Sequence, residues 1–378
     1  HLDGTPTARA QAAGRAAQVI EREAAELNEA QPAPARVGVF YDRRSYMVGG
    51  SQPTLSKLGN AERDSLLGVY RAFFEKQIPV DFVNSSDIQR GRLRDYRIVF
   101  FPFSVMLSRA VADGIRAYVE AGGTAVAGAR LAWNDARGYA SAVIPGFGLD
   151  RVFGGRERTI EPAAAPRMMP EPGTELSGLR AGWAIPGSAF EEALEPHAGA
   201  KIMARFSDGA PAIIENHYGK GTAILIGSFP ALAYQREHNA ATRALFLALA
   251  RAAGVQPEIE VSGVMPQFQA RRGGFTPPFL DGGINPPLHP RPKLRHYVSG
   301  SSQVEVRRLV SPESQFVFVF NHAEEATAAT IAIRLPWRPR AARDLITGSA
   351  APVSFENGEA VLHMNLPAGG TWIVRLIH

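Results

Sequence analysis

Residues 120–139, EAGGTAVAGARLAWNDARGY, decide which fold this chain adopts. The stretch predicts the end of a helix, a double-glycine turn and a short buried strand that runs into a polar loop. In α/β folds, binding and catalytic residues follow the ends of such strands. Trp133, Asn134, Asp135 and Arg137 follow this one, so their loop is the first candidate site.

The chain before this loop alternates between strand and helix patterns. Buried strands are expected at residues 36–41, 78–83 and 96–103, and helices are expected to begin after Asn60 and at Ser108. The residues between the first strand and Asn60 predict a polar loop. This alternation is typical of a mostly parallel sheet with helices on both faces.

The second half of the chain changes character twice. Strand patterns return after an irregular segment, and the YGKG of residues 218–221 predicts a hairpin turn. A Pro/Gly-rich segment without periodicity follows, and after it short alternating strands predict a small antiparallel β-sandwich. We therefore expect an N-terminal helix and linker (1–34), an α/β domain (35–257), a strap (258–302) and a β-sandwich domain (303–378).

Composition excludes several kinds of chemistry. The 378 residues contain no cysteine, which rules out disulfides and thiol nucleophiles. The net charge of +5 is spread along the chain, so it does not predict nucleic-acid binding. The sequence contains no run of 18 apolar residues, so it predicts no membrane-spanning helix. The histidines show no zinc-like spacing, and we expect neither a metal nor a cofactor.

Several motifs, taken in order, resemble the C-terminal half of glycoside hydrolase family 42 β-galactosidases. The matching pieces include GVYRAFFEKQIPVDFV (68–83), YRIVFFPFSVMLS (96–108), the stretch 115–141, IPGFGLDRVFG (144–154), GAPAIIENHYGKGTAILIGSF (209–229) and LPAGGTWIVRL (366–376). The resemblance implies a class I glutamine-amidotransferase-like, flavodoxin-like trimerisation domain, followed by a small β-domain. It also implies that the N-terminal helix, with Thr5 as its expected cap and Pro6 next to it, leaves a catalytic (β/α)8 barrel.

That barrel is absent from the 378 residues. The family's two catalytic glutamates lie on barrel strands, and no position here matches them, so the resemblance assigns no catalytic residue. The strand TAVAGARL occupies the position of the amidotransferase nucleophile, but it offers only Gly128, Ala129 and Arg130. The strand that would carry the histidine and acid offers Ser228 and Phe229. Both halves of an acyl-transfer site are therefore missing.

Three functions remain after this comparison. The first is an assembly portion of a β-galactosidase-like enzyme, expected to form a homotrimer, to act with a catalytic barrel domain or chain, and to have no activity alone. The second is a carbohydrate-binding module that holds a galactoside through the Trp133 loop, with Tyr41 and Arg44 at a neighbouring strand end. The third and weakest is an amidohydrolase using a serine among Ser104, Ser108 and Ser228.

The structural interpretation of the Trp133 loop is favoured over sugar binding. Asp135 and Arg137 would then bond the loop's own backbone, and Trp133 would pack beneath the irregular segment. We expect no nucleic-acid or membrane partner. A cytoplasmic protein is favoured, and a secreted one is the alternative if an upstream signal was removed.

Overall fold

The computed structural model describes residues 5, 7–51, 60–174, 182–263, 304–323 and 325–378. The chain divides into two units. Residues 32–258 form the first, here called the α/β unit, while residues 1–31 and 259–378 together form the second, here called the β unit. Most of the expected strap lies outside the described residues.

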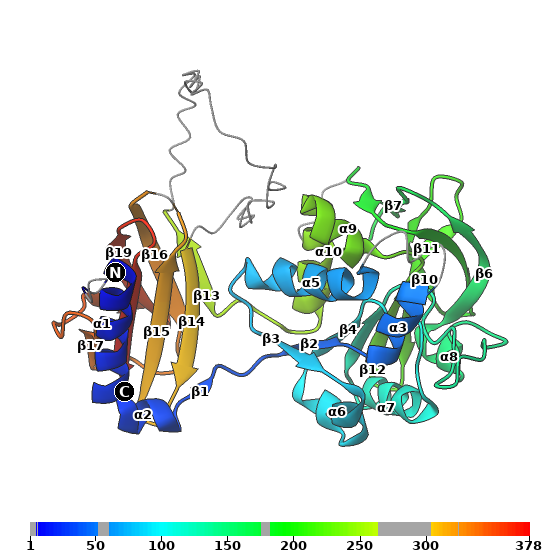
Figure 1. The fold of residues 1–378 in the computed structure, drawn as a ribbon. Helices are drawn as coiled ribbons and strands as arrows, with labels where there is room; N and C mark the ends of the chain where they lie inside the picture. The colour runs from blue at the N-terminus through cyan, green and yellow to red at the C-terminus, as the bar shows by residue number, and fades with distance from the viewer. Residues whose placement is uncertain (1–4, 6, 52–59, 175–181, 264–303, 324) are drawn as a thin grey trace, which may run out of the picture. The chain divides into compact units, whose positions relative to one another are not determined.

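The α/β unit is built on a nine-stranded sheet with the order β3-β2-β4-β5-β12-β11-β10-β7-β8 (Figure 1). Its first five strands in that order are parallel and the other four are antiparallel. The strands are β2 (Val37–Phe40), β3 (Val80–Val83), β4 (Ile98–Phe101), β5 (Thr124–Ala127), β7 (Arg167–Pro170), β8 (Ile185–Pro186), β10 (Lys201–Arg205), β11 (Pro211–Tyr218) and β12 (Gly221–Ile226).

The sheet is therefore mixed, whereas the alternation of the sequence predicted a mostly parallel one. The reversal occurs at the expected hairpin, where Tyr218 pairs with Gly221 and only Gly219 and Lys220 lie between them. Gly219 takes a φ of 60°, which a tight hairpin turn requires. A separate two-stranded sheet pairs β6 (Gly155–Pro162) with β9 (Phe190–Pro196).

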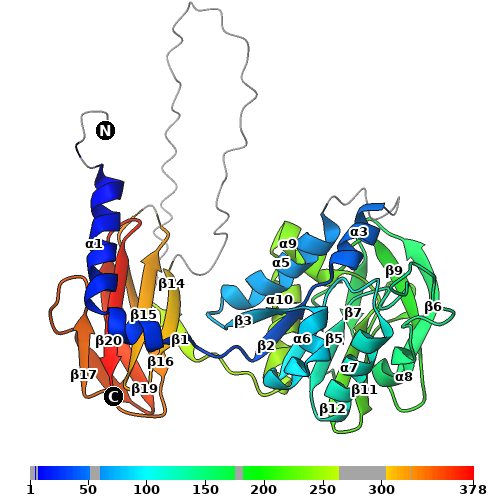
Figure 2. The same ribbon diagram turned by 60° about the horizontal axis from the view of Figure 1, so that its bottom comes forward.

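Two groups of helices cover the faces of the sheet, and alternate strand residues decide which group each face meets (Figures 1 and 2). Ile98 and Phe100 pack against α5, α9 and α10, whereas Val99 and Phe101 pack against α6, α7 and α8. The helices are α3 (Arg43–Ser51), α5 (Ala61–Phe74), α6 (Ser85–Gln89), α7 (Arg109–Glu120), α8 (Leu149–Phe153), α9 (Pro230–Glu237) and α10 (Ala240–Ala252), with a short 3₁₀ helix η1 (Arg92–Asp95).

Two local predictions were wrong. The segment after β2 was expected to be a polar loop, but it contains α3, because Asp42 accepts a hydrogen bond from the Arg44 N–H at 2.8 Å and caps that helix. The first helix, α1 (Ala8–Arg22), is capped by Thr7 and not by Thr5, since the Thr7 hydroxyl accepts from the Ala10 N–H at 3.1 Å. The helix start predicted at Ser108 is confirmed by the bond that Ser108 accepts from the Val111 N–H, and Asn239 caps α10 in the same way through the Thr242 N–H.

The β unit consists of two antiparallel sheets that share one core. One has the order β1-β14-β15-β20-β17 and the other β13-β16-β19-β18. The core includes Val317 and Val374 from the first sheet and Ile331 and Leu362 from the second. The strands are β1 (Gln31–Pro32), β13 (Ile259–Ser262), β14 (Val304–Val310), β15 (Ser314–Asn321), β16 (Thr327–Arg334), β17 (Ala341–Asp344), β18 (Val353–Glu356), β19 (Glu359–Leu366) and β20 (Thr371–Ile377).

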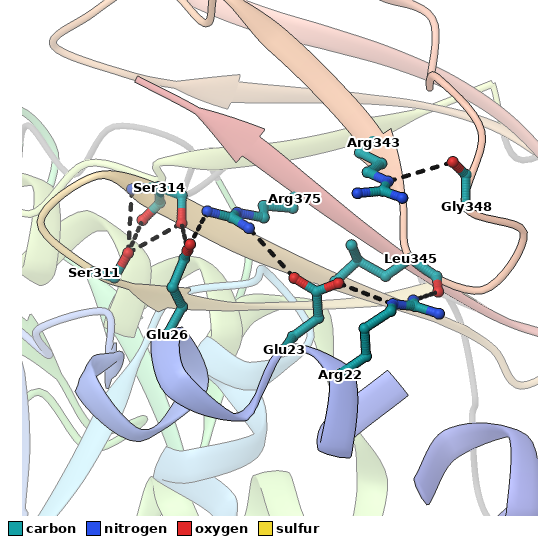
Figure 3. A network of polar contacts seen from close by, with 9 residues as sticks. All are labelled: Arg22, Glu23, Glu26, Ser311, Ser314, Arg343, Leu345, Gly348 and Arg375. Atoms are coloured by element: carbon teal, nitrogen blue, oxygen red, sulfur yellow. Dashed lines mark hydrogen bonds and ion pairs between the residues drawn. The ribbon is translucent and has the colours of Figure 1, made fainter. Parts of the chain in front are cut away.

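The N-terminal helices α1 and α2 (Ala24–Glu29) pack on the outer side of the first sheet. Val19 of α1 joins a small apolar cluster with Phe316, Leu345 and Ile373. Arg375 lies beside that cluster and forms ion pairs with the helix carboxylates (Figure 3). The β unit is thus assembled from both ends of the described chain.

Arg375 makes the most connected polar contact of this junction. Its guanidinium pairs with Glu26 and, at 3.3 Å, with Glu23, and its side chain is only 18% exposed. Ser314 donates to Glu26 at 2.9 Å, so the strand holds the same carboxylate a second time. Because these charges are largely removed from water, each depends on its partners for stabilisation.

Among the described residues, no helix combines the length and the hydropathy that a membrane span requires.

We predict that Arg375→Ala loosens α1 and α2 from the β unit. Removal of one partner leaves Glu23 and Glu26 poorly compensated, which costs about 2 kcal/mol at a partly buried pair. Amide hydrogen exchange of residues 8–29 should then accelerate roughly 30-fold. Arg343→Ala is the matched control, because this exposed arginine of the same sheet bonds only the Gly348 carbonyl among the described residues. Equal exchange in the two variants would contradict the prediction.

Candidate functional site

The candidate site lies at the edge of the sheet where parallel strands β2, β4, β5 and β12 end. Parallel strands bring the loops that follow them to one edge, and open α/β sheets bind their ligands there. The chain after β5 is held closely at this edge, since the Gly128 N–H donates to the Phe101 carbonyl and the Ala129 N–H to the Ser228 carbonyl. A side chain on Gly128 would come within 2.7 Å of the Pro102 carbonyl oxygen, so this close approach needs glycine.

Arg130 occupies the turn after β5, the position where the resemblance would place a nucleophile. Its φ of 61° puts a non-glycine residue in the left-handed region, and the residue is buried. Its N–H donates to the Glu192 carboxylate at 2.6 Å, and its guanidinium forms an ion pair with Glu157. The guanidinium carbon also lies 3.9 Å from the centre of the Trp133 ring. Its Nε is buried and has no hydrogen-bond partner among the described residues.

The turn after β5 depends on the carboxyl group of Glu192. It lies on β9 and is completely buried. Burial, and next the charge of Glu157, raise the pKa of the Glu192 carboxyl well above its usual value. One oxygen accepts from Arg130, while the other has no hydrogen-bond partner among the described residues. A protonated Glu192 thus supports the turn without a second buried negative charge beside Glu157.

The Trp133 loop is held mainly by its own backbone. Asn134 forms bridges with Met106 and Ala140, and its amide donates to the Gly138 carbonyl at 3.0 Å. Asp135 accepts from the N–H groups of Arg137 at 2.8 Å and Tyr139 at 3.0 Å. These contacts favour the structural interpretation for Asn134 and Asp135. Sugar contact through Trp133 and Arg137 stays a prediction.

The residues predicted after β2 reach the same edge. Ser45 of α3 bonds both the N–H and the carbonyl of Met106 at 3.1 Å, and Met106 in turn bridges to Asn134. Tyr41 is exposed, and Arg44 lies 4.0 Å from Asp42. Helix α3, which carries Arg44, is therefore linked to the Trp133 loop through Ser45 and Met106.

The three candidate serines occupy structural positions. Ser108 caps α7, and Ser228 is fully buried, accepting from the Ser188 N–H and donating to the Phe190 carbonyl at 2.8 Å. Ser104 is buried, and its hydroxyl has no partner among the described residues. Within the described parts of the chain, none of these serines forms a hydrogen bond with a general base. Within the described residues no group of three or more His, Asp or Glu side chains is placed to hold a metal.

Three acidic residues of this region were not predicted from the sequence: Glu62, Glu157 and Glu192. Glu157 and Glu192 lie on β6 and β9, in a segment whose irregular pattern concealed its strands. Glu62 stands in the first turn of α5 and is buried, although acidic residues in a first turn normally face solvent. Burial, and then the charge of Asp42, raise the pKa of Glu62 to about 7. Residues 189–195 read AFEEALE, without regular alternation of apolar and polar residues, so no local pattern signalled β9.

A family model described as "Beta-galactosidase trimerisation domain" matches residues 35–256. The chain belongs to this family. Beta-galactosidase LacZ of Heyndrickxia coagulans is 29% identical over 173 residues, which cover 44% of this chain and 24% of that relative. The corresponding figures for LacA of Lactobacillus acidophilus are 28%, 174 residues, 44% and 24%. The aligned region is thus about a quarter of each curated relative.

Solved structures extend the likeness in fold to nearly the whole chain. The β-galactosidase from Bacillus circulans sp. alkalophilus superimposes with a TM-score of 0.69 at 18% identity, covering 95% of this chain and 44% of that one. The α-L-fucosidase isoenzyme 2 from Paenibacillus thiaminolyticus gives a TM-score of 0.60 at 12% identity, with 95% and 51% covered. The family membership and the common fold confirm the resemblance found in the sequence. They concern less than half of the β-galactosidase chains.

We predict that Glu62 makes the stability of the α/β unit dependent on pH. The pKa of Glu62 is about 7 in the folded protein and 4.5 for an unperturbed glutamate, so the free energy of unfolding falls as pH rises between these values. Glu62→Gln mimics the protonated form and should remove this fall. Above pH 7 the variant should melt about 2–4 °C higher than the unchanged protein, the shift produced by ~1 kcal/mol.

Thermal unfolding across this pH range tests the prediction. Glu62→Ala serves as the control, because it removes the charge but also leaves a cavity, and should lower the midpoint at every pH. Parallel pH profiles for the unchanged protein and Glu62→Gln would show that this carboxyl does not titrate as described.

Proposed function

We propose that this chain is the non-catalytic assembly portion of a β-galactosidase-like glycoside hydrolase, and that it forms a homotrimer. Catalysis would reside in a barrel domain or chain outside these 378 residues. The observation that carries the proposal is the trimerisation-domain match over residues 35–256. The chain also corresponds to 44% of a solved β-galactosidase, which leaves room for a separate catalytic region.

The geometry after β5 supports the same proposal. In an amidotransferase-like domain, a nucleophile would stand at this turn, facing a base on a neighbouring strand. Here Arg130 stands there, and Glu157, Glu192 and Trp133 hold it. We infer an amidotransferase-like scaffold whose reactive turn serves as a packed joint.

The proposed assembly predicts a concentration-dependent mass. Sedimentation equilibrium of the complete chain should approach three times its mass of 40.7 kDa. Aryl β-galactosides should not be hydrolysed at any concentration, because no pair of carboxyl groups 5–5.5 Å apart is expected to face a bound sugar. A mass of 40.7 kDa at high concentration would contradict the proposed assembly role. Hydrolysis of aryl β-galactosides by this chain would contradict the proposal that it is non-catalytic.

A further inference from the structure

The edge that carries the candidate site exposes an apolar surface, here called the aromatic edge. It comprises Tyr41, Tyr46, Met47, Tyr139 and Val143, which are 39%, 48%, 65%, 70% and 40% exposed. Tyr46 and Met47 lie on α3, Tyr139 lies in the Trp133 loop, and Tyr41 and Val143 flank these two segments, which are linked through Ser45, Met106 and Asn134. They make up five of the nine large hydrophobic side chains found exposed among the described residues, so the concentration is local.

Two exposed arginines stand beside the residues of the aromatic edge in the sequence. Arg43 and Arg137 are exposed, and no ion pair joins either to an acid within the described parts of the chain. Tyrosine, methionine and arginine are the residue types enriched where proteins contact each other, and lysine and the acids are depleted there. The aromatic edge therefore has the composition of a protein-binding surface.

A second surface of the α/β unit has the opposite charge and is here called the acidic pair region. Glu161 of β6 and Glu191 of β9 are direct cross-strand partners, and Asp208 lies near enough to affect Glu191. Like charges placed opposite each other destabilise a sheet. Among the described residues no cation forms an ion pair with these three carboxylates, so no ion pair in that part of the chain offsets their repulsion.

The two surfaces lie on neighbouring sides of one packed cluster. Val48 of α3 and Ile160 of β6 pack against the same buried group, which contains Phe103, Phe190 and Phe229. The arginines and the carboxylates are thus presented by segments that share a core. In a cyclic trimer each copy contacts its two neighbours through two different, complementary surfaces. The aromatic edge and the acidic pair region could be these two surfaces.

We propose that the aromatic edge of one copy binds the acidic pair region of the next, with Arg43 and Arg137 placed against Glu161 and Glu191. The partner is a second copy of this chain, so the proposal rests on the proposed trimer and specifies its contact. Charge complementarity favours this head-to-tail pairing over a two-fold contact, which would set the arginines of one copy against those of the other. Tyr46, Met47 and Tyr139 would supply the apolar area of the interface.

Charge exchange within the full chain tests the pairing. Arg43→Glu with Arg137→Glu should give mutually repelling surfaces, and so should Glu161→Lys with Glu191→Lys. Either pair should weaken self-association at least tenfold in sedimentation equilibrium. The four changes together restore opposite charges in exchanged positions, so the trimer should return. Return of the trimer would also show that the variant with all four substitutions is folded. Loss of assembly alone could not distinguish a broken contact from a misfolded chain.

Arg90→Glu with Arg94→Glu is the matched control, since both arginines are exposed, follow α6 and belong to neither of the two surfaces. A trimer that survives either reversal, or one that the combined variant fails to restore, overturns the proposed contact while the trimeric function stands. An unchanged chain that stays monomeric overturns the function itself. Glu161→Gln with Glu191→Gln removes the repulsion without reversing it, and should weaken assembly less than the lysine pair.

Discussion

The bond from the Arg130 N–H to the Glu192 carboxylate is the constraint on which the functional edge depends. The parallel strand β5 must end among three other strands, and its chain leaves through a left-handed residue whose N–H is buried. A buried N–H without a partner is costly, so β9 brings a carboxyl group to it. The Arg130 side chain then holds Glu157 and the Trp133 ring. These contacts connect the turn after β5 to the two-stranded β6–β9 sheet.

The buried and the exposed side chains at this edge of the sheet differ in kind. Polar groups that could react are buried and hold one another, whereas the apolar side chains of Tyr46, Met47 and Tyr139 face outward. A catalytic cleft would be expected to show the reverse, with convergent polar groups accessible to a ligand. The arrangement is that of a rigid part presenting surface to another protein, which is the role proposed for the chain.

Much of this fold could be predicted because local signals and burial agree. Strands such as Ile98–Phe101 are apolar throughout, and the caps at Ser108 and Asn239 stand where the helical pattern begins. The turn back at Gly219 could also be predicted. The family resemblance was recognised from the order of several motifs. No single motif is specific enough to identify the family, but their order is.

The site could be predicted only in part, because its main contacts are distant in sequence. Arg130 and Glu192 are 62 residues apart, and no local pattern couples them. Helix α3 was concealed by its arginines and glycines, although Asp42 caps it. The Trp133 loop was located correctly at the end of β5, but its polar groups proved to bond its own backbone.

The most direct measurement of the account is oxidation of surface methionines by hydroxyl radicals at increasing protein concentration. Met47 of the aromatic edge is 65% exposed, and Met169, which belongs to neither proposed surface, is 40% exposed. If the carboxyl edge of the sheet serves assembly, oxidation of Met47 should fall relative to Met169 as the chain associates. A ratio that stays constant while the mass rises to that of a trimer would show that the chain assembles elsewhere and that this edge faces solvent.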